Sequence, residues 1–193
     1  MKISPGRQDG IAALRQRLFF ASELLKLAER ELAGDAINRQ GVAMACRNGA
    51  VLQLYAVLTG MLDDIAVRLR LESSPDVLTI AAVDQALAAR GMASPELARL
   101  AGLIESGAWL AACVETARRC LSSEPGGQRD VISADDHDHD HDHDHHSSAT
   151  RRINLVTTTA IEPLTGEDFA RIRQWIGGWN TLLDEFLVTL DEF

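Results

Sequence analysis

Histidine is absent from this 193-residue chain except within residues 137–146, which hold all six. This absence excludes catalytic arrangements that need an imidazole on the folded body, such as Ser-His-Asp, Cys-His and His-Glu-x-x-His. The Glu-x-x-His pattern of di-iron helical bundles is missing for the same reason. The sequence also has no glycine-rich phosphate-binding loop. We therefore predict that the protein is not an enzyme.

Cysteine is scarce, and the three residues of this type, Cys46, Cys113 and Cys120, form no Cys-x-x-Cys pair. An odd number without a disulfide framework indicates reduced thiols and a cytoplasmic location. The second and third cysteines are seven residues apart and would share a helix face. Their separation of roughly 10 Å along the axis nevertheless forbids a bridge. We expect all three to be small buried apolar residues.

Long apolar runs are also missing. The longest stretch without a charged residue is Asn48 to Leu62, fifteen residues, whereas a bilayer span needs about twenty apolar residues. Residues 1–10 lack the apolar core of a signal peptide. The sequence thus predicts a soluble cytoplasmic protein with no membrane-spanning segment, in which residues 48–62 belong to a buried helix.

Charge is weak outside the histidine-containing stretch. The formal net charge of the chain is −9, and leaving out the six aspartates of residues 135–146 reduces it to −3. A body so close to neutrality lacks the basic face on which nucleic-acid binding depends. We do not expect a nucleic-acid partner.

Apolar residues recur at steps of three and four over most of the chain, which is typical of amphipathic helices. A first helix is expected over Arg7–Ala33 and a second over about Ala36–Leu71, with Asp35 as the N-cap. Within the second helix, residues 41–50 are rich in glycine and alanine. They either allow a neighbouring helix to approach closely or mark a kink near Gly49. The core stripes are Leu14, Leu18, Ala21, Leu25, Ala28 and Leu32, followed by Leu54, Val57, Leu58, Met61, Ile65 and Leu69.

Start and stop signals indicate three further helices before residue 122. Ser74-Pro75 and Ser94-Pro95 each place a capping serine before a proline, and Gly91 would end the helix between them. A break at Ser106-Gly107 would separate the fourth helix from the fifth, although one continuous bent helix fits the pattern as well. The fifth helix carries Trp109, Leu110, Cys113, Ala117 and Leu121.

The helical pattern stops at residue 122 and returns near the end of the chain. Residues 122–150 are polar and are expected to form a disordered loop. Arg152–Thr158 alternates like a strand, but a single strand has no partner, so we expect an extended segment laid along the bundle. Thr165 then caps a last helix. Its stripe is Ile172, Trp175, Trp179, Leu182, Phe186 and Leu190.

These patterns predict an all-α protein with a bundle-like single domain of five to six helices. Residues 1–121 would form the main bundle, and residues 122–150 a long His/Asp-rich insert before the last helix. Residues 151–193 would complete the same bundle with their extended segment and C-terminal helix. An exposed apolar stripe on that last helix would favour a homodimer.

Residues 135–146 alternate aspartate and histidine and carry the clearest chemistry in the sequence. Imidazole and carboxylate are ligands for zinc, nickel and copper. Alternate side chains of an extended chain lie roughly 7 Å apart, too far for one tetrahedral ion, so the segment must curl around it. We call this stretch the His/Asp tract. Its predicted ligands are His137, His139, His141, His143, His145, His146, Asp138, Asp140, Asp142 and Asp144.

The expected binding is multi-site, moderate in affinity and poorly selective, with copper preferred over nickel and zinc. The aspartates raise the pKa of the imidazoles, and protonation should abolish binding as the pH falls through the histidine range. The tract resembles the histidine-rich loops of metallochaperones and metal transporters, over these twelve residues alone. The alternative is a tolerated low-complexity insertion in a surface loop, because long insertions cost little free energy.

Several core motifs resemble an uncharacterised bacterial all-helical family, a domain of unknown function. The motifs are Leu52-Gln53-Leu54-Tyr55, Ser94-Pro95-Glu96-Leu97, Trp109-Leu110 and the aromatic last helix. The resemblance covers most of the chain except residues 122–150 and implies a fold without a function. The alanine-rich second helix is also similar to the HEPN superfamily of helical nucleases and nucleotide-binding bundles. No histidine follows Arg47-Asn48, so the nuclease activity of that superfamily is not implied.

The leading expectation is a non-enzymatic helical interaction or scaffold protein of unknown partner, with accessory transition-metal binding by the His/Asp tract. No cofactor is required by this interpretation. One alternative makes metal storage or delivery the main task. Another is a catalytically inactive HEPN-like module that binds nucleotides or protein partners.

Overall fold

The computed structural model describes residues 5–71, 79–122 and 163–191, which belong to one compact unit. These residues form six helices and no strand, which confirms the all-α prediction. The helices are α1 (Pro5–Ala33), α2 (Arg39–Arg68), α3 (Ile80–Ala88), α4 (Pro95–Glu105), α5 (Trp109–Leu121) and α6 (Gly166–Asp191). The predicted extended segment Arg152–Thr158 lies outside the described residues.

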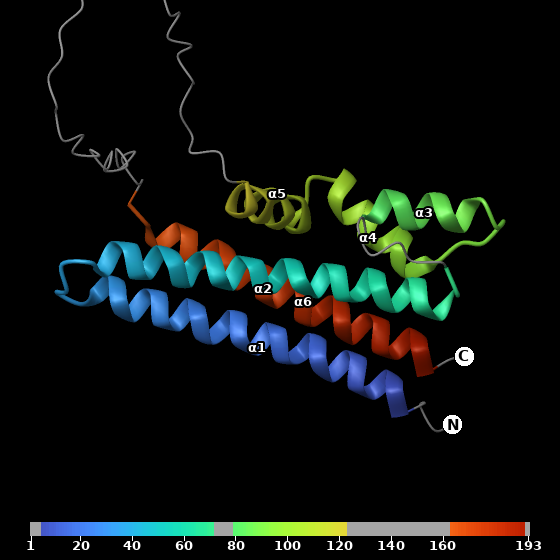
Figure 1. Ribbon diagram of the computed structural model, residues 1–193, viewed down its shortest axis with the longest axis horizontal. Helices are drawn as coiled ribbons and strands as arrows, with labels where there is room; N and C mark the ends of the chain where they lie inside the picture. The colour runs from blue at the N-terminus through green and yellow to red at the C-terminus, as the bar shows by residue number, and fades with distance from the viewer. Residues whose placement is uncertain (1–4, 72–78, 123–162, 192–193) are drawn as a thin grey trace, which may run out of the picture. The chain divides into compact units, whose positions relative to one another are not determined.

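Three long helices, α1, α2 and α6, pack side by side, with α1 antiparallel to the other two (Figure 1). The shorter α5 packs on α2 and α6, α4 packs on α5, and α3 contacts α4 and α2. The core fills the space among the three long helices and continues to where the shorter helices pack on α2 and α6. It contains the predicted stripes of α1 and α2, because residues three and four apart fall on the same helix face. Only Leu32 and Leu69 of those stripes are partly rather than fully buried.

Glycines of α2 allow α1 to approach closely. A Cβ built at Gly60 would lie 2.7 Å from Leu14 Cδ2, and one at Gly49 would lie 3.3 Å from Leu24 Cδ1. The helix continues without interruption through Gly49. Close approach therefore explains Gly49, whereas Gly41 has nothing within 4 Å of a built Cβ.

The predicted bounds of α2 were wrong at both ends. Asp35 is not its N-cap: Asn38 precedes the helix and makes no side-chain capping bond. At the other end the helix stops at Arg68 because Arg70 adopts a left-handed conformation with φ of 52°. The Leu71 N–H then donates to the Ala66 carbonyl at 2.9 Å, and Arg70 N–H donates to Val67 at 3.1 Å.

The guanidinium of Arg90, in the loop between α3 and α4, stabilises this left-handed end of α2. Arg90 Nη1 donates to the carbonyl oxygens of Leu69 and Arg70, at 3.2 and 2.8 Å. The Leu69 carbonyl is among those that a helix leaves unpaired at its C-terminus, and the Arg70 carbonyl follows directly after it. The cation also lies at the negative end of the α2 dipole, which favours it.

The start of α3 differs from the prediction, whereas its end agrees. Helix α3 begins at Ile80, capped by Thr79 Oγ1, which accepts from the Ala82 N–H at 3.1 Å. The predicted start at Ser74-Pro75 falls in residues 72–78, outside the described residues. Gly91 ends the helix as expected: its φ is 66°, and the next N–H, of Met92, donates back to Leu87 at 3.0 Å.

The predicted start of α4 and the break before α5 are confirmed. Ser94 Oγ accepts from the Leu97 N–H at 3.2 Å, and Pro95 occupies the first turn. The chain then turns at Gly107, with φ of 65°. Helices α4 and α5 are bent by 78° relative to each other, so they are two helices rather than one.

Helix α6 buries its predicted stripe in the core. Ile172, Trp175, Trp179 and Leu182 are buried and Phe186 is partly buried. The side chain of Leu190 lies outside the described residues. Because this stripe is covered within the chain, it no longer provides the surface on which the homodimer expectation depended. Leu121 belongs to the fifth helix as predicted, where it is the last residue of α5 and is 57% exposed.

By length and composition alone, helix α2 could cross a membrane. Helices α4 and α5 would also be long and apolar enough if they were counted together as one bent span. Half of the apolar window of α2 is buried inside the bundle. Its buried residues include Ala50, Val51 and Leu54, each without exposed surface. A helix at the centre of a bundle has this composition because it is apolar on more than one side.

Adjacent glycines in α6 provide a matched test of the packing. A Cβ at Gly178 would lie 2.5 Å from Trp109 Cε2, whereas one at Gly177 would meet nothing within 4 Å. We expect Gly178→Ala to lower the free energy of unfolding by about 1–3 kcal/mol through overpacking. Gly177→Ala should raise it by up to about 1 kcal/mol through helix propensity. Urea unfolding of both variants measures the difference, and equal effects would show that α5 and α6 are not in close contact at this point.

Candidate functional site

All the predicted metal ligands lie in residues 137–146, outside the described residues. Where the chain is described, no group of three or more His, Cys, Asp or Glu residues is placed to hold a metal ion. The end of α5 and the start of α6 lie at the same end of the helical unit (Figure 1). The chain therefore leaves and re-enters the bundle at one end when it passes through the segment that contains the tract.

The most buried charge among the described residues belongs to a group formed by Asp64, Arg68, Ser94 and Glu96, which we call the Arg68 cluster. Arg68 Nε lies 3.0 Å from Asp64 Oδ2, and Arg68 Nη1 lies 3.0 Å from Glu96 Oε1. Ser94 Oγ donates to the other oxygen of Glu96 at 2.7 Å. The cluster joins the C-terminal part of α2 to the first turn of α4.

Glu96 is only 7% exposed and is held in its charged form. Burial raises its pKa, but the hydrogen bonds from Ser94 and its own backbone, together with the Arg68 guanidinium, outweigh burial and lower the pKa below its ordinary value. A buried carboxylate with these partners avoids the large cost of an unpaired buried charge. The cluster is thus a structural ion pair that fixes α4 against α2.

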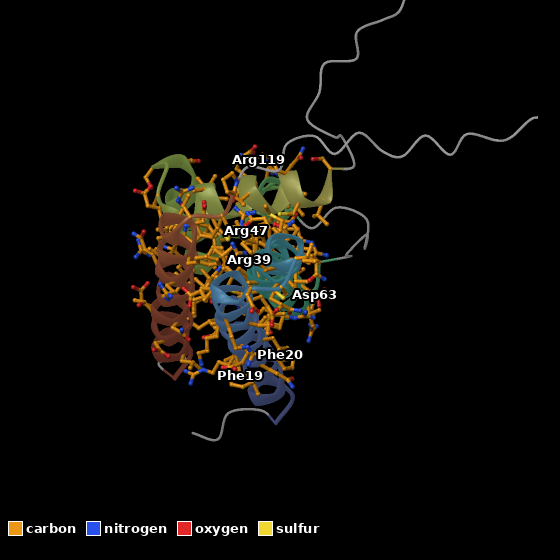
Figure 2. All side chains as sticks on the ribbon, turned by 90° about the vertical axis from the view of Figure 1, so that its left-hand side faces the viewer. Phe19, Phe20, Arg39, Arg47, Asp63 and Arg119 are labelled. Carbon is orange, nitrogen blue, oxygen red and sulfur yellow. The ribbon has the colours of Figure 1, made fainter. Side chains whose placement is uncertain are left out.

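The sequence patterns described above did not predict this cluster. Asp63 is exposed at the edge of the bundle (Figure 2), as expected for a solvated residue. Its neighbour Asp64 instead pairs with Arg68, one helical turn later. That i,i+4 spacing was the available signal, since residues so spaced face each other on a helix.

A second electrostatic feature lies at the start of α6. Asp168 Oδ2 accepts from the Thr165 N–H at 3.0 Å and from Thr165 Oγ1 at 2.9 Å. The backbone hydrogen bond from Thr165 is the main cause that lowers the pKa of Asp168, and nearby Arg47 and Arg171 lower it further. This confirms the predicted helix start, because an acid in the first turn is favoured by the helix dipole.

The cysteines agree in part with the expectation of small buried residues. Cys113 is buried, whereas Cys46 and Cys120 are partly buried. Burial raises the pKa of the Cys113 thiol to about 12, while the indole N–H of Trp179 acts in the opposite direction. A thiol with this pKa stays protonated at neutral pH, and only the thiolate binds metal or acts as a nucleophile.

Comparisons of the chain with protein-family models, with curated proteins and with solved structures find no match. The resemblance to a bacterial helical family and the similarity to the HEPN superfamily therefore stay predictions.

Substitution of Glu96 tests the Arg68 cluster. We expect Glu96→Gln to lower the free energy of unfolding by about 2 kcal/mol at about pH 7, because hydrogen bonds to charged groups contribute about 1.5–3 kcal/mol. The folded-state pKa of Glu96 is lowered from 4.5. Its contribution is therefore complete above that value and is lost as the pH falls through the folded-state pKa.

Chemical denaturation of both proteins at several pH values should show the difference shrinking below pH 4.5. Glu115→Gln is the matched control, because Glu115 forms a 3.7 Å ion pair with Arg119 in which both side chains are well exposed. We expect that control to change the free energy of unfolding by less than about 0.5 kcal/mol. A constant difference across the acid range would contradict a charged Glu96 in the folded state.

Proposed function

We propose that the protein is a non-enzymatic helical scaffold of unknown protein partner that binds divalent transition metals through its His/Asp tract. The observation that carries this proposal is the run of alternating aspartate and histidine over residues 135–146. Imidazole nitrogen and carboxylate oxygen are ligands that zinc, nickel and copper accept. The remaining part of the chain contains no histidine.

The side chains of the described helices support the proposal that the tract, and not the helical bundle, binds metal. The buried thiol of Cys113 is protonated, and the carboxylates of Asp64 and Glu96 are engaged by Arg68. These groups are poor metal ligands because they would have to lose a proton or an ion-pair partner first. Metal binding is accordingly assigned to the tract alone.

The placement of the tract supports a scaffold role for the bundle. The segment that contains it connects α5 to α6, whose facing ends lie at one end of the unit (Figure 1). A long insertion at such a point adds little loop-closure free energy and leaves the packed core unchanged. A long metal-binding segment between α5 and α6 is therefore compatible with the fold.

A protein partner is supported by exposed aromatic side chains on α1. Phe19 and Phe20 are 59% and 42% exposed, and their ring centroids are 6.0 Å apart. Figure 2 shows them on the opposite side of the bundle from Arg119 of α5. Aromatic residues are enriched at protein interfaces, where they supply much of the contact area.

Metal storage or delivery is the alternative function, and the number of ligands favours it. The ten predicted ligands exceed the four that one tetrahedral zinc ion needs. The tract could therefore load more than one ion, as a storage protein would. The HEPN-like alternative gains no comparable support from the described residues, where Arg47 donates to the side chain of Asn48 at 2.9 Å.

Removal of residues 137–146 tests the proposal. Calorimetric titration of the intact protein should show binding of copper, nickel and zinc, tightest for copper, and the deletion should abolish it. Binding to the intact protein should weaken as the pH falls through about 6.5, the ordinary pKa of histidine, because protons compete with metal for the imidazoles. The thermal melt of the metal-free deletion protein should match that of the metal-free intact protein.

A variant with all six histidines changed to glutamine, and the aspartates retained, is the matched control for length and charge. It should bind these metals as poorly as the deletion protein, since the imidazoles are the main ligands. Metal uptake that survives both changes would contradict the proposal. Cells that lose tolerance to excess metal on deletion of the tract, while partner capture is unchanged, would favour storage or delivery over the scaffold role.

A further inference from the structure

A cavity of about 220 Å³ lies among α1, α2 and α6, next to the first turn of α4. Its wall is mainly apolar, and all three long helices contribute residues to it. For comparison, an engineered cavity of about 150 Å³ lined by Leu, Ile and Phe stays dry and binds benzene. The space is therefore large enough for an apolar group somewhat bigger than a phenyl ring. The apolar wall includes Ile11, Leu14, Met61, Ile65, Leu183 and Phe186.

One part of the cavity wall is charged. Arg17 of α1 lines the cavity together with three members of the Arg68 cluster, namely Asp64, Arg68 and Glu96. Within the cluster, the guanidinium is shared by the two carboxylates at 3.0 Å each. Both acids are therefore already paired with Arg68, although one guanidinium between two carboxylates leaves the cluster with a formal charge of −1.

Arg17 has no such compensation. Among the described residues its side chain makes one long contact, 3.5 Å from Nη1 to the amide oxygen of Gln53, and no ion pair. The cavity thus combines an apolar wall with one guanidinium that has no ion-pair partner among the described residues. A guanidinium has five N–H donors in a planar arrangement that matches a carboxylate, so the chemistry of Arg17 selects an anion.

We propose that this cavity is a binding site for a small amphipathic monocarboxylate. Its apolar group would occupy the space between Leu14, Met61 and Leu183, and its carboxylate would pair with Arg17. A primary amine is the competing occupant because the Arg68 cluster keeps a formal charge of −1, but both of its carboxylates already have an ion-pair partner, whereas Arg17 has none. A neutral alcohol is disfavoured because it gains no ion pair. This site is independent of the His/Asp tract and of the proposed metal binding.

Three probes that share the same phenylpropane carbon skeleton and differ only in their polar group test this preference. They are 3-phenylpropanoate, 3-phenylpropan-1-ol and 3-phenylpropylamine. Each is titrated into the full chain while backbone amide shifts are recorded by NMR. We expect saturable shifts at the cavity-lining parts of α1 and α2, and a dissociation constant about tenfold lower for the carboxylate than for the alcohol or amine, since charge-assisted bonds are the strong ones. The protein lacking residues 137–146 should bind the carboxylate equally well.

Arg17→Gln should weaken binding of the carboxylate about tenfold and leave binding of the alcohol unchanged. The matched control is Arg15→Gln, because Arg15 lies on the same helix but pairs with Asp184 at 2.7 Å and does not line the cavity. That control should bind all three probes as the wild type does. Ala13→Phe places a ring at the cavity wall from an exposed backbone position and should weaken all three probes.

Several results would overturn the proposal. These are equal affinity for the three probes, a preference for the amine, an unchanged carboxylate affinity in the Arg17 variant, or shifts that cluster away from the cavity. If Ala13→Phe fails to fold, the comparison of Arg17→Gln with Arg15→Gln still decides the question, because both positions are exposed.

Discussion

The arrangement of the helices depends on the burial of one face of α6. Trp179 has no exposed surface, and its ring meets Trp109 of α5 edge to face, with centroids 5.3 Å apart and planes at 76°. Gly178 makes room for that ring. Because α6 also contacts α1 and α2, the same face closes the three long helices and attaches the shorter ones to them. Truncating a buried tryptophan costs about 3–5 kcal/mol, a large part of the stability of a domain.

Ion pairs set the register of α6 without supplying much of its stability. Arg15 pairs with Asp184 near the C-terminal half of α6, and Glu29 pairs with Arg173 near its start. Exposed pairs of this kind contribute about 0–1 kcal/mol each. Their positions at two points along α1 nevertheless disfavour sliding of α6 by one turn, since both pairs would break together. The buried pair of Arg68 and Glu96 has a different role, because it holds the first turn of α4 against the C-terminal part of α2.

The helical part of the fold could be predicted from sequence because its signals are local. Apolar spacing placed the stripes of α1, α2 and α6, and Ser94, Gly91 and Gly107 marked the helix ends. The prediction failed where a distant residue decides the outcome. The end of α2 depends on Arg90, about twenty residues later, whose guanidinium caps the last carbonyls. No periodicity within α2 indicates that contact, so the predicted helix ran on to Leu71.

The candidate sites also differ in whether their residues are close together in the sequence. The His/Asp tract is visible in the sequence because its ligands are consecutive, and it stays a prediction. The cavity and the Arg68 cluster could not be found in this way, since their residues come from four helices. Arg17 and Glu96 are ordinary surface-type residues in the sequence, and only their placement beside Leu14 and Met61 gives them a role.

The long separation in sequence between α5 and α6 has a consequence for biosynthesis. The hairpin of α1 and α2 has contacts close in sequence and can form as soon as it leaves the ribosome. The groove that receives Trp175 and Trp179 stays uncovered until α6 emerges. Synthesis of residues 123–162 alone delays the emergence of α6 after α5 by about 2–8 s at typical elongation rates. During that interval the nascent chain presents apolar surface to the cell, so chaperone binding matters more for this protein than for one whose packed helices follow each other directly in sequence.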